Sequence, residues 1–176
     1  MISICVDYEY LKVLRGGEIG FIPQSISYLD PLSKVGKQVR NYSNKTEVVK
    51  KQRKVFKDFD LCENSEKLYP FQLSGGMARR ALISTAVMED SQLIIADEPT
   101  PGLDIESSSK TMGYFKNFAS KGKAVILITH DIGLAINYSD KVAVFYGGQI
   151  IELTKAAYFK KGIKYLRHPY SKALYE

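Results

Sequence analysis

Two short stretches of the chain are apolar at almost every position, without the alternation that marks a half-exposed strand. Such runs are typical of strands buried on both faces of a parallel sheet. We therefore predict two buried strands, at Gln92–Ala96 and at Lys123–Thr129. Asp97 and Glu98 follow the first strand, and His130 follows the second. Because parallel strands end at one edge of a sheet, where such folds bind ligands, these three polar residues are expected at that edge.

Other segments repeat their apolar residues every three or four positions, which predicts amphipathic helices. Lys45–Asp60 is one of them, with lysine and arginine between the apolar positions. Met77–Glu89 is a second, which Ser74 can cap, and Ile105–Ser120 is a third, with Asp104 as its N-cap residue. The predicted apolar face of this third helix consists of Ile105, Met112, Phe115 and Ala119.

Shorter elements account for most of the remaining sequence. Glu18–Gln24 is predicted as a strand that runs into a turn. Ile132–Tyr138 is predicted as a short helix, and a hairpin joins Lys141–Phe145 to Gln149–Leu153 through two glycines. Met1–Val6 is compatible with a strand or with a frayed end.

The order strand, helix, strand over residues 92–129 predicts a βαβ unit and an α/β fold. A length of 176 residues, with 45% hydrophobic and 25% charged residues, is ordinary for one globular domain. No run approaches the ~20 apolar residues that cross a bilayer, and the first residues do not resemble a signal peptide. Cys5 and Cys62 have no metal-ligand spacing, so we expect reduced thiols in a cytosolic protein.

The net charge of +6 comes partly from one segment. Lys34–Lys57 holds nine lysines and arginines against a single acidic residue, Glu47. We favour a solvated helical face for this segment over a nucleic-acid surface. Only Tyr42 and Phe56 are aromatic within this segment, so it lacks the regular interleaving of aromatic and basic residues that a surface for single-stranded nucleic acid would require.

Two small groups of residues suggest phosphate chemistry. Ser74-Gly75-Gly76 lies where a helix begins, and exposed backbone N–H groups at the positive end of a helix dipole suit a phosphate. The alternative for this tripeptide alone is a plain turn and helix cap. Asp97-Glu98 at the end of a buried strand suits a Mg²⁺-binding aspartate beside a glutamate that acts as acid or base.

Five elements occur in an order that resembles the ATP-binding subunits of ABC transporters. They are Gln24, Leu73–Met77, Leu93–Glu98, Gly102–Asp104 and His130. They match the Q-loop, signature, Walker B, D-loop and H-loop of that family, and we call Leu73–Met77 the signature segment. The resemblance implies a P-loop NTPase-like parallel sheet with an inserted helical subdomain. Met77 and the tail 168–174 are similar to the oligopeptide, dipeptide and nickel importer branch.

The resemblance also implies ATP and Mg²⁺ as cofactors and assigns catalytic roles. Asp97 would hold Mg²⁺, and Gln24 would complete the shell around the metal and the attacking water. Glu98 would be the general base, and His130 would contact the γ-phosphate. Phosphoryl transfer depends largely on positioning and charge neutralisation, so such parts can be supplied by two chains.

The remaining implied roles lie at a dimer interface. Ser74, Gly75 and Gly76 would clamp the γ-phosphate of a nucleotide held mainly by a second ATP-binding subunit, in a homodimer or a heterodimer. Asp104 would couple the two nucleotide sites. The other implied partners are integral membrane permease subunits, which would place the chain at the cytoplasmic face of the membrane, and no nucleic acid is expected.

One motif of the family is missing from the sequence. No G-x-x-x-x-G-K-[S/T] occurs, and the Gly-Lys pairs at Gly36-Lys37 and Gly122-Lys123 lack both the earlier glycine and the following hydroxyl. We therefore expect a fold that is incomplete at its N-terminal side. The expected organisation is a single partial domain over 1–176, with a helical subdomain at about 25–90, a core at about 91–153 and a tail at 154–176.

Three functions are compatible with these motifs and with the missing phosphate-loop motif. The favoured one is a truncated or split ATPase subunit that energises a peptide or nickel importer and has little activity alone. The second is a non-catalytic partner that supplies the signature face to a complete ATPase. The third is an ABC ATPase that acts on nucleic acid, for which the short helical subdomain offers no room for a coiled-coil or zinc insertion.

Overall fold

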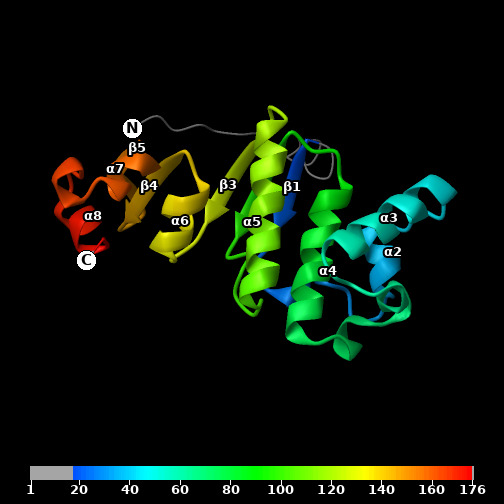
Figure 1. Cartoon of the computed structure of the whole chain (residues 1–176). Coiled ribbons are helices and arrows are strands. Elements are labelled where there is room, and N and C mark those ends of the chain that lie inside the picture. Colours follow the sequence, from blue (N-terminus) through cyan, green and yellow to red (C-terminus); the bar gives the residue numbers. More distant parts are fainter. Residues whose placement is uncertain (1–17, 176) are drawn as a thin grey trace. The chain divides into compact units, whose positions relative to one another are not determined.

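A computed structural model describes residues 18–175 of the chain. The backbone divides into two compact units, one that extends to Ile128 and one that starts at Thr129 (Figure 1). Each unit is described by itself below. The segment Met1–Val6, for which a strand or a frayed end was expected, lies outside the described residues.

The first unit is built on a parallel sheet of three strands. The strands are β1 (Ile19–Ile22), β2 (Leu93–Asp97) and β3 (Ala124–Ile128), in the order β1-β2-β3. Ile22 pairs with Ala96, and Asp97 pairs with Ile128. The residues after the three strands therefore leave the sheet at the same edge, as the sequence predicted. The predicted α/β class with a parallel sheet is confirmed.

The prediction that both apolar runs are buried strands is wrong for β3. Ile94 and Ala96 on β2 are fully buried, whereas Ile126 and Ile128 on β3 are each 49% exposed. Within residues 18–175, β3 pairs with β2 alone and forms an edge of the sheet. An apolar composition makes burial favourable, but a strand is buried only where neighbours cover it.

Helix α4 (Gly75–Met88) is buried on almost every side. Its N-cap residue is Ser74, whose Oγ accepts a hydrogen bond from the Met77 backbone N–H at 3.2 Å, as predicted. The helix packs against β1. An apolar stripe at positions 82, 83, 86 and 87 is buried, and Arg79 is buried with it.

Helix α5 (Ile105–Ser120) connects β2 to β3 and packs against β3 (Figure 1). Asp104 caps it, as the sequence predicted. The predicted apolar face needs a correction, because Ile105 is 90% exposed and Ala119 is also exposed. The buried stripe consists of Ser107, Thr111, Met112, Phe115 and Phe118. Ile105 is the first residue of the helix, where no neighbouring element within residues 18–175 covers its side chain.

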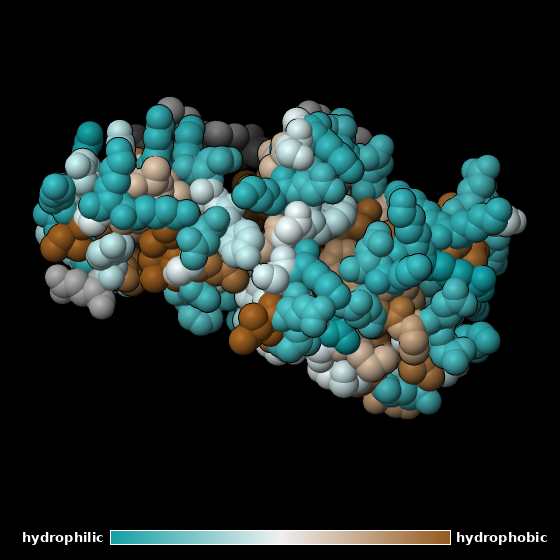
Figure 2. Space-filling model, in the orientation of Figure 1, coloured by the Kyte–Doolittle hydropathy of each residue, from teal (hydrophilic) through white to brown (hydrophobic). Residues whose placement is uncertain are grey.

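The segment between β1 and α4 forms a small helical layer. It contains the 3₁₀ turns η1 (Ile26–Tyr28), η2 (Glu63–Lys67) and η3 (Pro70–Gln72) and the helices α2 (Val35–Val39) and α3 (Thr46–Asp58). Its core includes Leu29, Val35, Val39, Phe56, Leu61, Ala78, Ala81 and Leu82. The outer side of α3 carries its lysines, and the surface over it is hydrophilic in Figure 2. The predicted amphipathic helix is confirmed.

The second unit contains an antiparallel hairpin and short helices. Its elements are α6 (Ile132–Tyr138), β4 (Lys141–Tyr146), β5 (Gln149–Lys155), α7 (Ala156–Lys160), η4 (Ile163–Tyr165) and α8 (Pro169–Ala173). Val142, Val144, Ala156, Phe159 and Leu166 form its core. Glu152 is buried and accepts the backbone N–H groups of Arg167 and His168, both at 3.0 Å. The predicted hairpin and short helix are confirmed.

Candidate functional site

The signature segment presents backbone N–H groups at the start of a long helix. The first N–H groups of a helix, here those of Gly75 and Gly76, have no acceptor within the helix. A Cβ added at Gly75 would meet no atom of the chain within 4 Å, so the backbone there is open to a ligand. A Cβ at Gly76 would lie 3.2 Å from the Gly102 carbonyl oxygen. Gly76 therefore lets the turn after β2 approach the helix closely.

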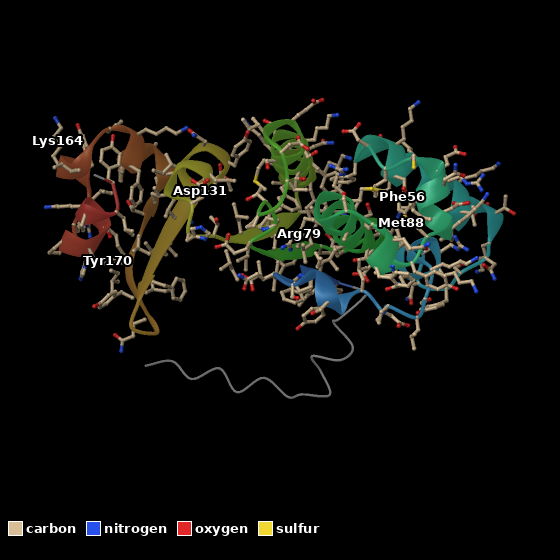
Figure 3. The ribbon with its side chains drawn as sticks, turned by 90° about the horizontal axis from the view of Figure 1, so that it is seen from below. Phe56, Arg79, Met88, Asp131, Lys164 and Tyr170 are labelled. Atoms are coloured by element: carbon tan, nitrogen blue, oxygen red, sulfur yellow. The ribbon has the colours of Figure 1, made fainter. Side chains whose placement is uncertain are left out.

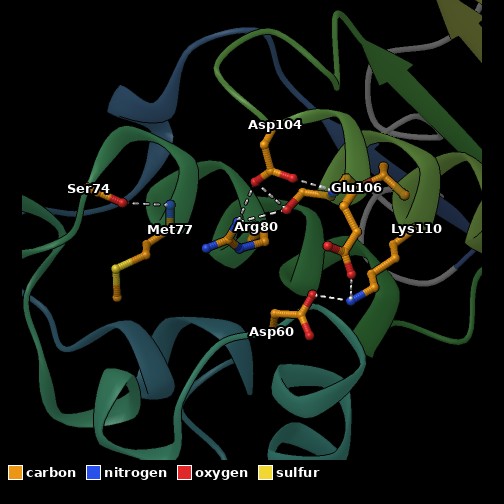
Figure 4. A network of polar contacts seen from close by, with 9 residues as sticks. Asp60, Ser74, Met77, Arg80, Asp104, Glu106 and Lys110 are labelled. Atoms are coloured by element: carbon orange, nitrogen blue, oxygen red, sulfur yellow. Dashed lines mark hydrogen bonds and ion pairs between the residues drawn. The ribbon is translucent and has the colours of Figure 1, made fainter.

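A polar network fixes the same turn to α4 (Figure 4). The Asp104 carboxylate accepts the backbone N–H of Ser107 at 2.8 Å and its hydroxyl at 2.9 Å. Arg80 on α4 donates from Nη1 to the Ser107 hydroxyl at 2.9 Å, and this Nη1 lies 3.8 Å from Oδ2 of Asp104. The Ser107 N–H and hydroxyl, with Arg80 nearby, lower the pKa of Asp104 below its ordinary value. The signature segment and Asp104 are thus held together within one chain.

Asp97 and Glu98 lie at the carboxyl edge of the sheet, both half-buried. The backbone N–H of Glu98 donates to the Ile128 carbonyl at 2.9 Å, and Glu98 has a positive φ of 44°. A positive φ is costly for a glutamate, and such strain is concentrated at functional sites. The backbone therefore turns sharply directly after the strand.

Gln24 follows the neighbouring strand at the same edge. The pairing of Ile22 with Ala96 places the end of β1 beside the end of β2. The Gln24 side chain is exposed, whereas its backbone carbonyl accepts a hydrogen bond from Arg79. Gln24 and the acidic pair therefore lie at adjacent strand ends.

Arg79 and Arg80 are residues that sequence reasoning missed. Arg79 (labelled in Figure 3) is only 6% exposed. Burial lowers its pKa, and the carboxylates of Asp97 and Glu98 act in the opposite direction. The signal was present in the sequence, because Arg79 falls on the apolar stripe of α4, where a cation needs a reason to be buried.

His130 belongs to the second unit and is described with that unit. It lies two residues after β3, and its side chain is exposed. The next residue, Asp131, caps α6 by accepting the Leu134 N–H at 2.9 Å (Figure 3). The role of His130 stays a prediction.

A metal ion in a protein is held by several donor side chains arranged around one point. Among residues 18–175, no group of three or more His, Cys, Asp or Glu residues is arranged to hold a metal ion. Mg²⁺ commonly binds through one or two carboxylates together with substrate phosphates. Asp97 and Glu98 could supply such carboxylates.

Comparison with known proteins defines the class of this site. Residues 7–101 match the family described as "ABC transporter". The chain is 35% identical, over 94% of its length, to the "Oligopeptide transport ATP-binding protein OppD" of Lactococcus lactis subsp. cremoris. It is 36% identical, over 81% of its length, to the protein of the same name in Bacillus subtilis.

A solved structure supports the same assignment. The structure is a dimeric post-hydrolysis state of the ATP-binding cassette MJ0796 bound to ADP and Pi, with a TM-score of 0.77 and 28% identity. The match covers 86% of this chain and 68% of that one. The chain therefore belongs to the ABC transporter family of ATP-binding proteins. It spans about half the length of the curated relatives it matches, since the match covers 51% of the Lactococcus protein.

Proposed function

We propose that the chain is part of the ATP-hydrolysing subunit of an ABC importer for peptides, and that it acts as a single partial ATP-binding domain. The observation that carries this proposal is the arrangement around the start of α4. Open N–H groups at Gly75 and Gly76 lie against the Gly102–Asp104 turn, while Gln24 and the acidic pair lie at adjacent strand ends. The similarity to oligopeptide transport proteins supports peptides as the cargo. Nickel is the cargo that the family branch would allow besides peptides.

We assign the residues of this chain the following tasks. Ser74, Gly75 and Gly76 clamp the γ-phosphate of a nucleotide held mainly by a second ATP-binding subunit, the two glycines through their backbone N–H groups. Glu98 accepts the proton of the attacking water, and His130 contacts the phosphate that is transferred. Asp104, already engaged with Ser107 and 63% exposed at its side chain, faces the second site of a dimer.

Asp97 and Gln24 are the residues we assign to Mg²⁺. When bound, Mg²⁺ would neutralise charge that develops on the phosphate oxygens. Asp97 is half-buried at the end of a central strand, so its carboxylate is held in place by the sheet rather than by a flexible loop. Gln24 can add a neutral oxygen ligand from the neighbouring strand end.

A set of exposed apolar side chains supports contact with membrane permease subunits. Leu32 is 88% exposed, Phe71 74% and Tyr28 69%, and all three lie between Gln24 and the signature segment. We assign these three side chains to the contact with the permease. None of the helices within residues 18–175 is long and apolar enough to cross a membrane. We place the chain at the cytoplasmic face of the membrane, attached through the permease.

A second candidate follows from the motif that the sequence does not contain. The signature side of the site is present, whereas no phosphate-binding G-x-x-x-x-G-K-[S/T] occurs in the chain. A second ATP-binding subunit, in a homodimer or a heterodimer, would then supply the phosphate loop, and this chain alone would hydrolyse little ATP. In the second candidate function the chain supplies only its signature face to such a partner and does not catalyse.

The test is association with an ATP-binding cassette that carries the phosphate loop, measured by light scattering with and without MgATP. We expect association that depends on nucleotide. Gly75→Ala should weaken it about tenfold or more, because the added methyl group occupies the space where a phosphate approaches the backbone.

Gly113→Ala is the matched control, since Gly113 also lies within a helix with open space around its Cβ. It should fold at least as well as the parent chain and associate equally. Association that is absent, or independent of nucleotide, would contradict the proposal. Glu98→Gln separates the two candidates: loss of ATP turnover at retained association indicates catalysis by this chain, and unchanged turnover indicates the non-catalytic role.

A further inference from the structure

Arg79 makes contacts that packing alone does not require. Its Nη1 donates to the Pro23 carbonyl at 3.0 Å, and its Nη2 donates to the Gln24 carbonyl at 2.5 Å. These are consecutive carbonyls directly after β1, and 55 residues separate Arg79 from Gln24 in the sequence. The guanidinium is therefore hydrogen-bonded to the backbone at the point where the chain leaves β1 toward η1.

The burial of this guanidinium is costly. Its Nε atom is buried and has no hydrogen-bond partner, and the acceptors of its other nitrogens are neutral carbonyls. Taking a cation out of water costs several kcal/mol unless close ionic partners compensate. The positions around it on α4, Ala78, Ala81 and Leu82, show that an apolar residue would suit this surface. The hydrogen bonds of Arg79 to the Pro23 and Gln24 carbonyls therefore explain the buried charge better than a gain in stability does.

Two features suggest that the hydrogen bond from Arg79 to the Gln24 carbonyl positions this segment. The fork of an arginine can hold two acceptors in a fixed relative position, which a lysine cannot do. The helix that carries Arg79 also begins with Gly75 and Gly76, so the same rigid element reaches the phosphate-binding N–H groups and the backbone of Gln24. Attraction to the carboxylates of Asp97 and Glu98 adds a favourable contribution to the cation.

We propose that Arg79 is a positioning residue that fixes the backbone of Gln24 to the signature helix α4. The two hydrogen bonds of the guanidinium form a bidentate clamp that holds Gln24 in position for its assigned task. The catalytic part of this inference rests on the proposed function, whereas the clamp itself is a property of the chain alone. The two parts are tested separately.

The clamp is tested by hydrogen exchange on the isolated chain. The reporters are the amides of Ser27, Tyr28 and Leu29, which are hydrogen-bonded within and around η1. Arg79→Gln should accelerate their exchange about tenfold, while the amides of α5 keep their rates. Arg79→Lys should give an intermediate rate, because one ammonium group can retain one of the two contacts.

Arg53→Gln is the control for the loss of an arginine from the same unit. Arg53 is paired with Glu66 at 3.0 Å on the helical layer, and its substitution should leave the three reporter amides unchanged. If Arg79→Gln accelerates exchange equally over α4, α5 and the strands, Arg79 has only a general structural role and the proposal is overturned. Unchanged reporters in a folded Arg79→Gln variant would overturn it as well.

The functional part is tested in the complex with the phosphate-loop partner, by a double-substitution cycle. Arg79→Gln and Gln24→Ala should each lower kcat, with KM changed less than about twofold, and the double variant should be no slower than Gln24→Ala. Additive losses would show that Arg79 does not act through Gln24. If the parent complex neither forms nor turns over ATP, the proposed function fails, while the exchange result for the clamp still stands.

Discussion

The strands β2 and β3 have nearly the same composition but different surroundings. Both are five residues long and apolar, and they pair with each other in parallel register. β2 has a neighbour on either side, and Ile94 is fully buried. β3 has one strand neighbour within the described part of the chain, and Ile126 is about half exposed. The comparison shows that burial is decided by position in the sheet rather than by composition.

This difference extends to the residues that follow each strand. Asp97 and Glu98 leave the central strand, and the Glu98 N–H is bonded to the Ile128 carbonyl of β3. The acidic pair is thus supported by β3, because Asp97 also pairs with Ile128. A central position suits residues that must hold a fixed geometry, because packing restrains the strand that carries them.

The sharpest test of the comparison uses a matched pair of substitutions. Ile94→Ala should cost about 2–5 kcal/mol of unfolding free energy, because it leaves a cavity in a closed core. Ile126→Ala should cost roughly 1 kcal/mol, since only half of that side chain is removed from water. Urea unfolding followed by circular dichroism measures both values. Equal losses would mean that β3 is covered as well as β2.

A smaller loss of stability is expected from a substitution in the segment that connects β2 to β3. Asp104→Ala removes the cap of α5 and both bonds to Ser107, so it should destabilise the first unit less than Ile94→Ala does. The folded-state pKa of Asp104 lies below its ordinary value of 3.8, so this carboxylate stabilises the fold fully above that value. Its contribution is lost as the pH falls through the lower, folded-state pKa.

The difference in unfolding free energy between the parent chain and Asp104→Ala should therefore be constant from about pH 5 to about pH 7 and shrink in more acidic solution. Asp104→Asn, which can keep an acceptor for the Ser107 N–H, is the control and should retain part of the cap at every pH. A difference that grows on acidification would contradict this assignment.

The smallest effect on stability is expected from Ile126→Lys. The side chain is half exposed on an edge strand, and charged residues at such edges hinder pairing with other chains. We expect a nearly unchanged unfolding midpoint and a clear decrease in aggregation, measured by light scattering at rising protein concentration. Ile105→Lys adds the same charge at a 90% exposed helical position and should not suppress aggregation to the same degree.

The candidate site shows how far sequence reasoning extends. Asp97, Glu98 and His130 were expected at one edge because each follows a predicted strand and the ends of parallel strands share an edge, whereas Gln24 was assigned to the same site only by the family resemblance. Ser74 and Asp104 were predicted as caps from residue type and position, and both accept the expected backbone N–H. These features are local, so a single stretch of sequence contains the information.

The hydrogen-bond partners of Arg79 and Arg80 could not be predicted from a single stretch of sequence. Their partners lie 55 and 27 residues away in the sequence, on the end of β1 and at the start of α5. A hydrogen bond between such distant segments depends on how α4 is packed, and packing is a property of the assembled fold. The contact between Gly76 and the Gly102 carbonyl has the same origin.

The sequence by itself predicted the strands, the helices α3, α4, α5 and α6, two caps, the parallel sheet and, by resemblance, the family, because period, capping residues and short motifs act over a few residues. Only the tertiary structure decided that β3 is an exposed edge among residues 18–175, that Ile105 lies outside the core, and that a buried arginine is hydrogen-bonded to the backbone of Gln24. The physical reason is that burial and long-range hydrogen bonds depend on which segments become neighbours, and neighbours are chosen by the whole chain.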